Sequence, residues 1–414
     1  MSKTILLNQS DWHFTKENPG IPTAVMGEAV ALPHTWNAVD GQDGGNDYYR
    51  GTCWYTLALA KPTIPAGGKA VLQLDGAAMT AAIYLNGEKL AEHKGGYSTF
   101  RAEITELLQA ENQLTVQVDN SVNDRIYPQK ADFTFYGGIY RDVSLLVVNK
   151  NHIALGHFGD TGVKITPDLK EGSADIQVET LVEGEGTVAV ELLDAEGSIV
   201  AKGEGEKTSL HLDAPHLWNG VKDPYLYTCV VRLLQDGQPV DEVTTKVGLR
   251  SFSVDAKKGF FLNGKPYPLH GVSRHQDRKG LGNAITREMH DEDMALIREL
   301  GVNTVRLAHY QHDQYFYDLC DKYGMVVWAE IPYISEHLPN GRENTISQMK
   351  ELIHQNYNHP SIVCWGVSNE ITISTKDKAD MLDNHRVLNE LCHKMDPTRL
   401  TTLACYAMCG PFNP

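Results

Sequence analysis

Polar side chains that could do chemistry follow several apolar stretches in the second half of the chain. The apolar run 361–367 leads directly into Ser368-Asn369-Glu370, and Glu330 follows the apolar run 325–329. Carboxylates at such positions are suited to general acid and base catalysis. His275 follows the first predicted strand, and Arg306 and His309 lie at the end of the second. The carboxyl ends of parallel strands meet at one mouth, so we expect all of these side chains to share one site.

Glu370 is the strongest catalytic candidate on physical grounds. A carboxylate at the end of an almost continuous apolar strand would be costly to bury without a partner or a task. Purely structural roles are the alternative for the other polar residues. His275 and His309 could be satisfied polar groups at strand ends, Arg306 could form a structural ion pair, and Glu330 could be buried support.

These residues need a repeating β/α framework to position them, and the sequence after residue 260 predicts one. Residues 291–300 place Met294, Ile297 and Leu300 at helical spacing, and Gly301 follows as a stop signal. The predicted helices are 291–300, 313–323, 343–357 and 378–395. The predicted strands are 266–272, 303–307, 325–329, 361–367 and 400–404. Five strands and four helices predict an incomplete (β/α)8 barrel or an open parallel sheet.

The first 250 residues predict only strands and turns. Asn86-Gly87 and Asp236-Gly237 each separate two strand-like segments, which is a strong signal for a tight hairpin. Frequent turn residues without a long helical pattern favour two β-sandwiches. Polar breaks then predict three domains: a jelly-roll sugar-binding domain at 1–150, an immunoglobulin-like sandwich at 151–254, and a truncated α/β barrel at 255–414.

Composition narrows the class of partner. The 414 residues carry 53 acidic and 37 basic side chains, a net charge of −16, which disfavours nucleic acids and anionic membrane surfaces and favours a neutral substrate. We found no signal peptide or membrane-spanning apolar run. The seven cysteines are scattered without metal-ligand spacing, so we expect a reducing cytoplasmic location, with Cys320 and Cys364 as core residues.

Several motifs together resemble glycoside hydrolase family 2, which contains β-galactosidases and β-glucuronidases. The first is the segment 132–143, Asp-Phe-Thr-Phe-Tyr-Gly-Gly-Ile-Tyr-Arg-Asp-Val, which is similar to the part of the N-terminal domain that reaches the active site in that family. The others are Pro-His-Leu-Trp at 215–218, Pro-Tyr-Leu-Tyr at 224–227, Val-Gly-Leu-Arg-Ser-Phe at 247–252, Asn-Gly-Lys-Pro at 263–266 and Gly-Val-Ser-Arg-His at 271–275. The resemblance runs through the whole chain.

The resemblance implies a retaining hydrolysis of β-linked glycosides or oligosaccharides. Glu370 would protonate the glycosidic oxygen and later activate water, and Asn369 would hydrogen-bond the sugar 2-hydroxyl. Residues that would contact other hydroxyls are Asp132, His275 and His309, and Arg306 would orient the nucleophile. In the family the nucleophile is a Glu that ends the seventh barrel strand. The last acidic residue here is Asp396, so we expect an N-terminal portion that is inactive alone.

Substrate, metal and assembly are predicted less directly. We expect a β-galactosidase, because of the site residues and the acidic charge; the alternatives are a β-glucuronidase and a non-catalytic carbohydrate-binding fragment. Many family members bind Mg²⁺ through Glu-x-His, but Glu336 and His337 are adjacent here, so no metal site is assigned and a shifted Mg²⁺ site stays an alternative. The unpaired last strand predicts a homo-oligomer.

Overall fold

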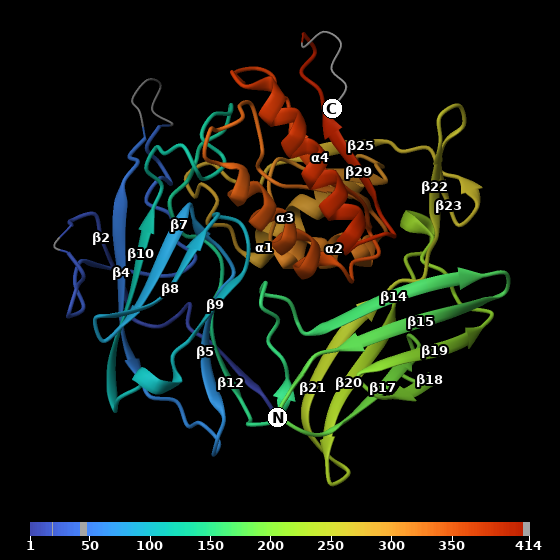
Figure 1. Cartoon of the computed structure of the whole chain (residues 1–414), viewed down its shortest axis with the longest axis horizontal. Coiled ribbons are helices and arrows are strands. Elements are labelled where there is room, and N and C mark those ends of the chain that lie inside the picture. The colour runs from blue at the N-terminus through green and yellow to red at the C-terminus, as the bar shows by residue number, and fades with distance from the viewer. Residues whose placement is uncertain (19, 42–47, 409–414) are drawn as a thin grey trace.

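The computed structural model describes residues 1–18, 20–41 and 48–408, and Cys409 lies outside them. Figure 1 shows two all-β bodies, one blue to cyan and one green, with an α/β body in orange and red packed above and between them. This arrangement confirms the predicted fold class of two sandwiches followed by part of an α/β barrel. No helix among the described residues is both long enough and apolar enough to span a bilayer.

The N-terminal body is a jelly-roll sandwich of two antiparallel sheets. One sheet has the order β1 (Lys3–Leu6), β12 (Val143–Val148), β5 (Lys69–Leu74) and β9 (Phe100–Glu103). The other has the order β3 (Glu28–Val30), β2 (Trp12–Thr15), β4 (Thr52–Ala60), β10 (Glu111–Asp119), β7 (Thr80–Leu85) and β8 (Glu88–Lys94). Short strands β6 (Ala77–Ala78) and β11 (Gly138–Ile139) pair beside them, and η1 spans Thr105–Leu107.

The predicted hairpin turn at Asn86-Gly87 is confirmed. It joins β7 to β8, and both turn residues have positive φ, 53° and 86°, as a type I′ turn requires. Apolar side chains from the inner faces of both sheets form one buried core, which includes Trp12, Tyr55 and Leu72. The sandwich is therefore a rigid support for the loop 120–137 that leaves β10.

The second body is an immunoglobulin-like sandwich. Its sheets are β14 (Val163–Lys170), β15 (Ser173–Thr180) and β19 (Lys207–Asp213), and β18 (Ile199–Glu204), β17 (Thr187–Leu193), β20 (Tyr227–Gln235) and β21 (Gln238–Val247). Minor elements are β13 (His152–Ile153), β16 (Val182–Glu183) and η2 (Gly220–Lys222). The predicted Asp236-Gly237 turn joins β20 to β21, again with positive φ at both residues. The domain boundaries themselves stay predictions.

The α/β body begins with a small hairpin sheet, β22 (Phe252–Asp255), β23 (Gly259–Leu262) and β24 (Lys265–Pro266). A five-stranded parallel sheet follows in chain order: β25 (Gly271–Arg274), β26 (Thr304–Leu307), β27 (Val326–Glu330), β28 (Ile362–Asn369) and β29 (Leu400–Ala404). The helices are α1 (Arg287–Glu299), α2 (Gln314–Tyr323), α3 (Arg342–Asn356) and α4 (Lys378–Met395).

The predicted first strand, 266–272, was wrong in extent. Pro266 belongs to hairpin strand β24, and the parallel strand runs only from Gly271 to Arg274. The chain must reverse out of the hairpin before it can pair with β26, which places the strand later than its apolar residues suggest. The predicted stop signal is confirmed: Gly301 follows the end of α1 in the left-handed conformation with φ 70°. Gly324 ends α2 in the same way with φ 76°.

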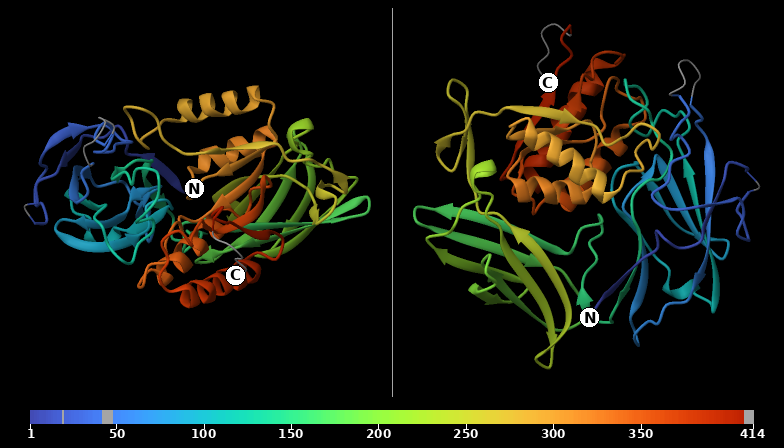
Figure 2. Two further views of the ribbon diagram at one scale, coloured as in Figure 1. Left: turned by 90° about the horizontal axis from the view of Figure 1, so that it is seen from above. Right: turned by 180° about the vertical axis from the view of Figure 1, so that it is seen from behind.

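Hydrogen bonds between side chains and backbone hold the three bodies together. Arg141 of the first sandwich donates to the Gln311 carbonyl at 2.8 Å, and Trp218 of the second donates to the Asp321 carbonyl at 2.9 Å. Figure 2 shows both sandwiches against the α/β body from above and from behind. The loop of the first sandwich is thereby held at the sheet edge where the strands end.

A buried ion pair fixes the strand that follows α4. Asp396 is 0% exposed, and its carboxylate accepts hydrogen bonds from Arg399 at 2.8 Å and from the Trp365 indole at 3.0 Å. Burial alone would raise the pKa of Asp396, but Arg399 and Thr398 hold it below its ordinary value. The carboxylate therefore stays ionised and tied to β28.

We predict that Asp396→Ala lowers the free energy of unfolding by about 3–5 kcal/mol, because it leaves the Arg399 charge buried without its partner. The matched control is Glu390→Ala, which removes an exposed pair with Arg386 and should change stability by less than about 1 kcal/mol. Urea titration of the unfolding transition measures both. Equal effects of the two substitutions would contradict the structural role of the buried pair.

Candidate active site

Four parallel strands bring the predicted site residues to one edge of the sheet. His275 directly follows β25, His309 follows β26, Glu330 ends β27, and Asn369 ends β28 with Glu370 next in the chain. The strands pair in parallel register, with Arg306 opposite Trp328 and Glu330 opposite Gly366. The carboxyl ends therefore converge, as the alternation of helices and strands predicts.

Glu330 lies at the centre of the site and is 0% exposed. Arg306 donates to it from Nε at 3.1 Å and from Nη2 at 2.9 Å, and His309 Nδ1 lies 2.7 Å from Oε1. A carboxylate can only accept, so Nδ1 of His309 carries the proton. The Arg306 guanidinium also lies over the Trp328 ring, 4.4 Å from its centroid. Two donors thus satisfy a carboxylate that would otherwise be costly to bury.

The backbone of β28 comes very close to Glu330. A Cβ added to Gly366 would lie 2.5 Å from the Glu330 Cβ and 2.5 Å from the Trp328 indole nitrogen. Neither atom is the far end of a flexible chain that could move aside. Glycine is therefore required at 366 for steric reasons.

Asn369 is held in one orientation by the same arginine. Arg306 Nη2 donates to Asn369 Oδ1 at 2.6 Å, and the Asn369 backbone bonds to Tyr333 and Ser335 of the preceding loop. The carbonyl end of the amide is thus occupied, which leaves its NH₂ group as the donor for a ligand.

Glu370 adopts a conformation that is rare for its residue type. Its φ is +47°, and its backbone N–H donates to the Ala404 carbonyl at 2.8 Å. A left-handed non-glycine residue costs about 1–3 kcal/mol and persists where the surroundings enforce it, often at functional sites. The side chain is half-buried. Across the described parts of the chain, no hydrogen bond or ion pair holds its carboxylate, unlike that of Glu330.

A loop of the first sandwich completes the site. The Phe133 ring lies 5.0 Å from the His275 ring and 5.6 Å from the Tyr310 ring, measured between centroids. This contact brings the exposed carboxylate of Asp132 to the same edge. Burial and the neighbouring His309 lower the pKa of His275, and Asp132 is among the groups that partly oppose this shift. His275 is therefore neutral near pH 7 and can exchange hydrogen bonds with hydroxyls.

A second layer of residues behind His275 was not predicted from the sequence. Arg274 is buried and binds Asp293, and it also donates to His290 Nδ1 and His312 Nδ1, each at 3.0 Å. Burial and the Arg274 charge lower the pKa of His290 to about 3. Both imidazoles are thus neutral acceptors. The sequence Ser273-Arg274-His275 could have indicated this buried arginine, because consecutive side chains along a strand point to opposite faces of the sheet.

Glu336 and His337 are the residues at which a shifted Mg²⁺ site was the alternative. His337 is buried, with Nδ1 at 2.6 Å from the Tyr333 hydroxyl and Nε2 at 2.5 Å from Asp380. Both ring nitrogens are engaged, so this histidine does not fit an Mg²⁺ site. One other group in the described residues has metal-ligand geometry: Asp318, Asp321 and His359. It lies before β27 and β28, at the opposite end of the sheet from Glu370.

Sequence comparison matches family models to three successive parts of the chain. The sequence model "Glycosyl hydrolases family 2, sugar binding domain" matches residues 24–149, "Glycosyl hydrolases family 2" matches 157–250, and "Glycosyl hydrolases family 2, TIM barrel domain" matches 253–410. The chain therefore belongs to glycoside hydrolase family 2.

Some relatives are named β-glucuronidase and others β-galactosidase. A β-glucuronidase of Bacteroides fragilis is 40% identical over 97% of this chain and 60% of its own length. A β-galactosidase of Thermoanaerobacter pseudethanolicus is 31% identical over 90% of this chain and 51% of its own. The crystal structure of an FMN-binding β-glucuronidase from Faecalibacterium prausnitzii L2-6 has 42% identity and a TM-score of 0.94, over 100% of this chain and 65% of that one. The chain thus spans about half to two thirds of these relatives.

We predict that Gly366→Ala lowers the free energy of unfolding by about 1–3 kcal/mol, because the added methyl forces Glu330 and Trp328 apart. Thr402→Ala is the control, since Thr402 pairs with Gly366 across the strand and its truncation should cost less than about 1 kcal/mol. Urea denaturation compares the two. Wild-type stability of Gly366→Ala would mean that Glu330 is not packed as described.

Proposed function

We propose that the protein is a β-glycosidase that hydrolyses glycosides with retention and uses Glu370 as its acid/base residue. The observation that carries the proposal is the contrast between two carboxylates at one sheet edge. Glu330 is fully buried and bound by Arg306 and His309, whereas Glu370 is half-buried and free of such partners. Membership of glycoside hydrolase family 2 supports it.

In this proposal Glu370 first donates its proton to the glycosidic oxygen as the bond to the anomeric carbon breaks. It then accepts a proton from the water that releases the sugar. The Asn369 NH₂ group donates to the sugar 2-hydroxyl, and Arg306 fixes the amide so that it can do so. Asp132, His275 and His309 bind further hydroxyls from the sandwich loop and the first two strands. Arg306 additionally orients the nucleophile, as the resemblance implies.

The nucleophile must be a second carboxylate, distinct from Glu370. A retaining enzyme needs two carboxylates about 5–5.5 Å apart on either side of the bond. Glu330 cannot serve, because its oxygens accept from Arg306 and His309 at 0% exposure. We therefore propose that the second carboxylate comes from outside the described residues and that residues 1–414 alone do not turn over substrate.

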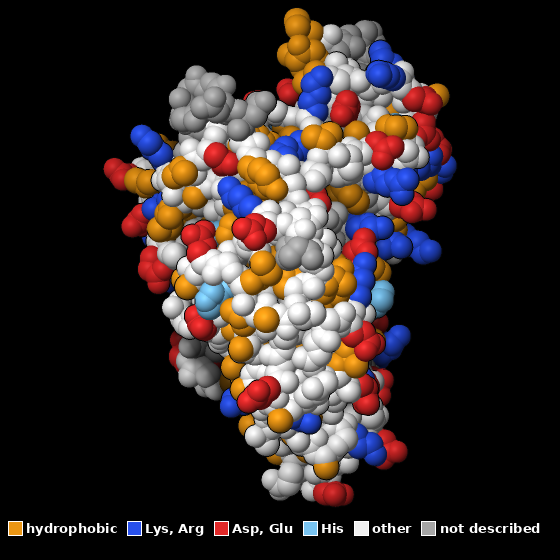
Figure 3. All heavy atoms as spheres, turned by 90° about the vertical axis from the view of Figure 1, so that its left-hand side faces the viewer, with side chains coloured by type: hydrophobic (Ala, Val, Ile, Leu, Met, Phe, Trp, Pro, Cys, Tyr) orange, Lys and Arg blue, Asp and Glu red, His pale blue; other side chains and the backbone are white. Residues whose placement is uncertain are grey.

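We propose a β-glucuronide as substrate in place of the β-galactoside expected from the sequence. The 40% and 42% identical relatives are both named β-glucuronidases, which favours this choice, while a β-galactosidase is 31% identical. Net charge discriminates poorly between a neutral and an anionic sugar for a physical reason. Charges separated by more than about 8 Å are screened at physiological salt, and acidic and basic side chains are interspersed on the face in Figure 3.

The remaining parts of the proposal concern cofactors, location and assembly. Glycoside hydrolysis transfers protons and a glycosyl group and no electrons, so neither a redox cofactor nor FMN is needed for this reaction. We propose no Mg²⁺ requirement, because His337 is committed to Tyr333 and Asp380. Five described cysteines form no disulfide, which supports a reducing cytoplasm: Cys53, Cys229, Cys320, Cys364 and Cys392. β29 has β28 as its one strand neighbour in the described sheet, which supports a homo-oligomer.

The substrate proposal predicts a preference in the complete natural protein that contains these residues. We expect kcat/KM for nitrophenyl β-glucuronide to exceed that for nitrophenyl β-galactoside by about tenfold or more, as recognition of one charged group provides. Equal or greater rates on the galactoside would restore the galactosidase alternative. No hydrolysis of either would favour the non-catalytic carbohydrate-binding alternative.

The acid/base proposal predicts how Glu370→Gln depends on the leaving group. Loss of general acid catalysis should lower kcat/KM by about 10²–10⁴-fold for an alkyl glycoside, whose alkoxide must be protonated to leave. The loss should be much smaller for a nitrophenyl glycoside, because nitrophenolate leaves without protonation. Steady-state kinetics on both substrates measure the difference. An equal loss for both leaving groups would contradict the role of Glu370 as the acid.

A further inference from the structure

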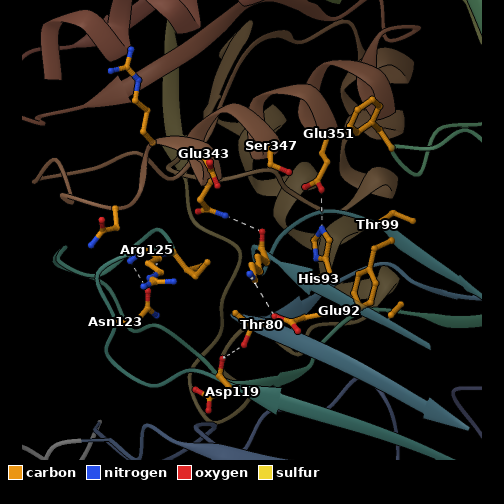
Figure 4. Close-up of a pocket in the computed structure, with 18 of the residues that line it drawn as sticks. Thr80, Glu92, His93, Thr99, Asp119, Asn123, Arg125, Glu343, Ser347 and Glu351 are labelled. Carbon is orange, nitrogen blue, oxygen red and sulfur yellow. Dashed lines mark hydrogen bonds and ion pairs between the residues drawn. The ribbon is translucent and has the colours of Figure 1, made fainter. Parts of the chain in front are cut away.

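A groove between the first sandwich and α3 is separate from the site at Glu370. Its volume is about 1400 Å³. Figure 4 shows one wall on α3, with Glu343, Ser347 and Glu351 directed toward the strands of the sandwich. These three residues are spaced by four, so they lie on one face of the helix and span about 12 Å. The groove is therefore long and not a compact hole.

The opposite wall comes from the six-stranded sheet. Thr80 begins β7, Glu92 and His93 lie on β8, and Asp119 ends β10. These residues face α3 across the groove in Figure 4. Two domains thus contribute one wall each, and ligand sites occur preferentially at such interfaces.

Hydrogen bonds between the domains fix the distance between the two walls. At one end Asn344 accepts from the Tyr127 N–H at 2.9 Å and donates to the Lys94 carbonyl at 2.9 Å. At the other end Gln355 accepts from the Thr99 N–H at 3.0 Å and donates to the Thr99 carbonyl at 2.9 Å. The groove is therefore formed before any ligand binds, which lowers the entropic cost of binding.

The charges in the groove exclude some ligands and favour others. Its lining contains four acidic and four basic side chains, and several are already paired: Lys94 lies 3.7 Å from Glu92, and Arg342 binds Asp380 at 2.8 Å. A balanced and internally paired lining attracts neither a polyanion nor a polycation. The Ser347 hydroxyl and the Glu343 carboxylate also line the groove, whereas the Asn123 amide is bonded within its own loop.

One end of the groove combines aromatic rings with unsatisfied polar atoms. His93 stacks on Phe100 with 4.4 Å between ring centroids, and Phe158 also lines this end. His93 Nε2 lies 2.9 Å from Glu351 Oε1, but His93 Nδ1 and Glu351 Oε2 are buried and have no hydrogen-bond partner among the described residues. The Glu351 side chain is only 9% exposed. Such groups call for a partner, which a ligand hydroxyl would supply.

The other end of the groove reaches the rim on which Glu370 lies. Asn340 and Arg342 follow the loop that starts at Glu330, and His337 of that loop donates from its backbone to Thr375 at 2.8 Å. A ligand in the groove would therefore extend from the rim along the face of α3 that is directed toward the first sandwich.

We propose that this interdomain groove is a second carbohydrate site that binds a neutral oligosaccharide chain. Sugar hydroxyls form hydrogen bonds with carboxylates and hydroxyls, and apolar sugar faces pack on aromatic rings; both kinds of group line the groove. A chain of several sugars also matches the length of the α3 wall. Binding here does not depend on turnover at Glu370, so the test below can fail without affecting the proposed activity.

The test measures binding by isothermal titration calorimetry on the 414-residue protein. The probes are neutral hexasaccharides of β-1,4-linked glucose, galactose and xylose, with hexagalacturonate as an anionic probe of equal length. We expect at least one neutral probe to bind saturably, and hexagalacturonate to bind at least tenfold more weakly than it. Ser347→Trp fills the groove from α3 and should weaken neutral binding at least about tenfold.

Ser209→Trp is the matched control, because Ser209 is exposed on β19 of the second sandwich. It should leave the affinity unchanged. Ser347→Leu replaces Ser347→Trp if the tryptophan variant does not fold by circular dichroism. Binding of none of the neutral probes, equal or tighter binding of hexagalacturonate, or wild-type affinity of the Ser347 variant would overturn the proposal.

Discussion

The site depends on one buried carboxylate. Glu330 is fully enclosed at the end of the central strand β27, and an ionised group in that position is stable only when donors surround it. Arg306 and His309 provide those donors from the neighbouring strand. The same arginine then reaches Asn369 on the other side, so one electrostatic requirement ties three adjacent strands together at their carboxyl ends.

The packing around the buried Glu330 carboxylate also fixes residues farther from it. Its close contact with β28 demands glycine at 366, and the strand beyond that contact ends in Asn369 and the left-handed Glu370. On the other side, His275 packs against Phe133 of the sandwich, while burial and the Arg274 charge keep the histidines behind it neutral. The first sandwich is therefore part of the site and does more than flank it. The groove along α3 lies at the same interface, away from Glu330.

Much of the fold was predictable because it follows local rules. The two predicted turns, Asn86-Gly87 and Asp236-Gly237, formed hairpins, and helix 378–395 has the predicted bounds. The first parallel strand was misplaced, because its predicted first residue, Pro266, instead pairs with β23 in a hairpin. Site residues that follow strands were predictable from topology. The pairing of Arg306 with Glu330, the position of Phe133 and the groove were not, since they depend on side-chain packing between strands and domains.

The sequence favoured a β-galactoside, whereas the names of the relatives favour the β-glucuronidase alternative. Net charge describes the whole molecule, while specificity arises from a few contacts. The assignment of Glu370 as acid/base residue is most directly tested by azide addition to a Glu370→Ala variant of the complete natural protein. Azide would attack the anomeric carbon of the glycosyl-enzyme and displace the nucleophilic carboxylate, in place of activated water. We predict formation of the β-glycosyl azide, identified by NMR. Formation of the α-glycosyl azide would show that Glu370 is itself the nucleophile, and would contradict the account.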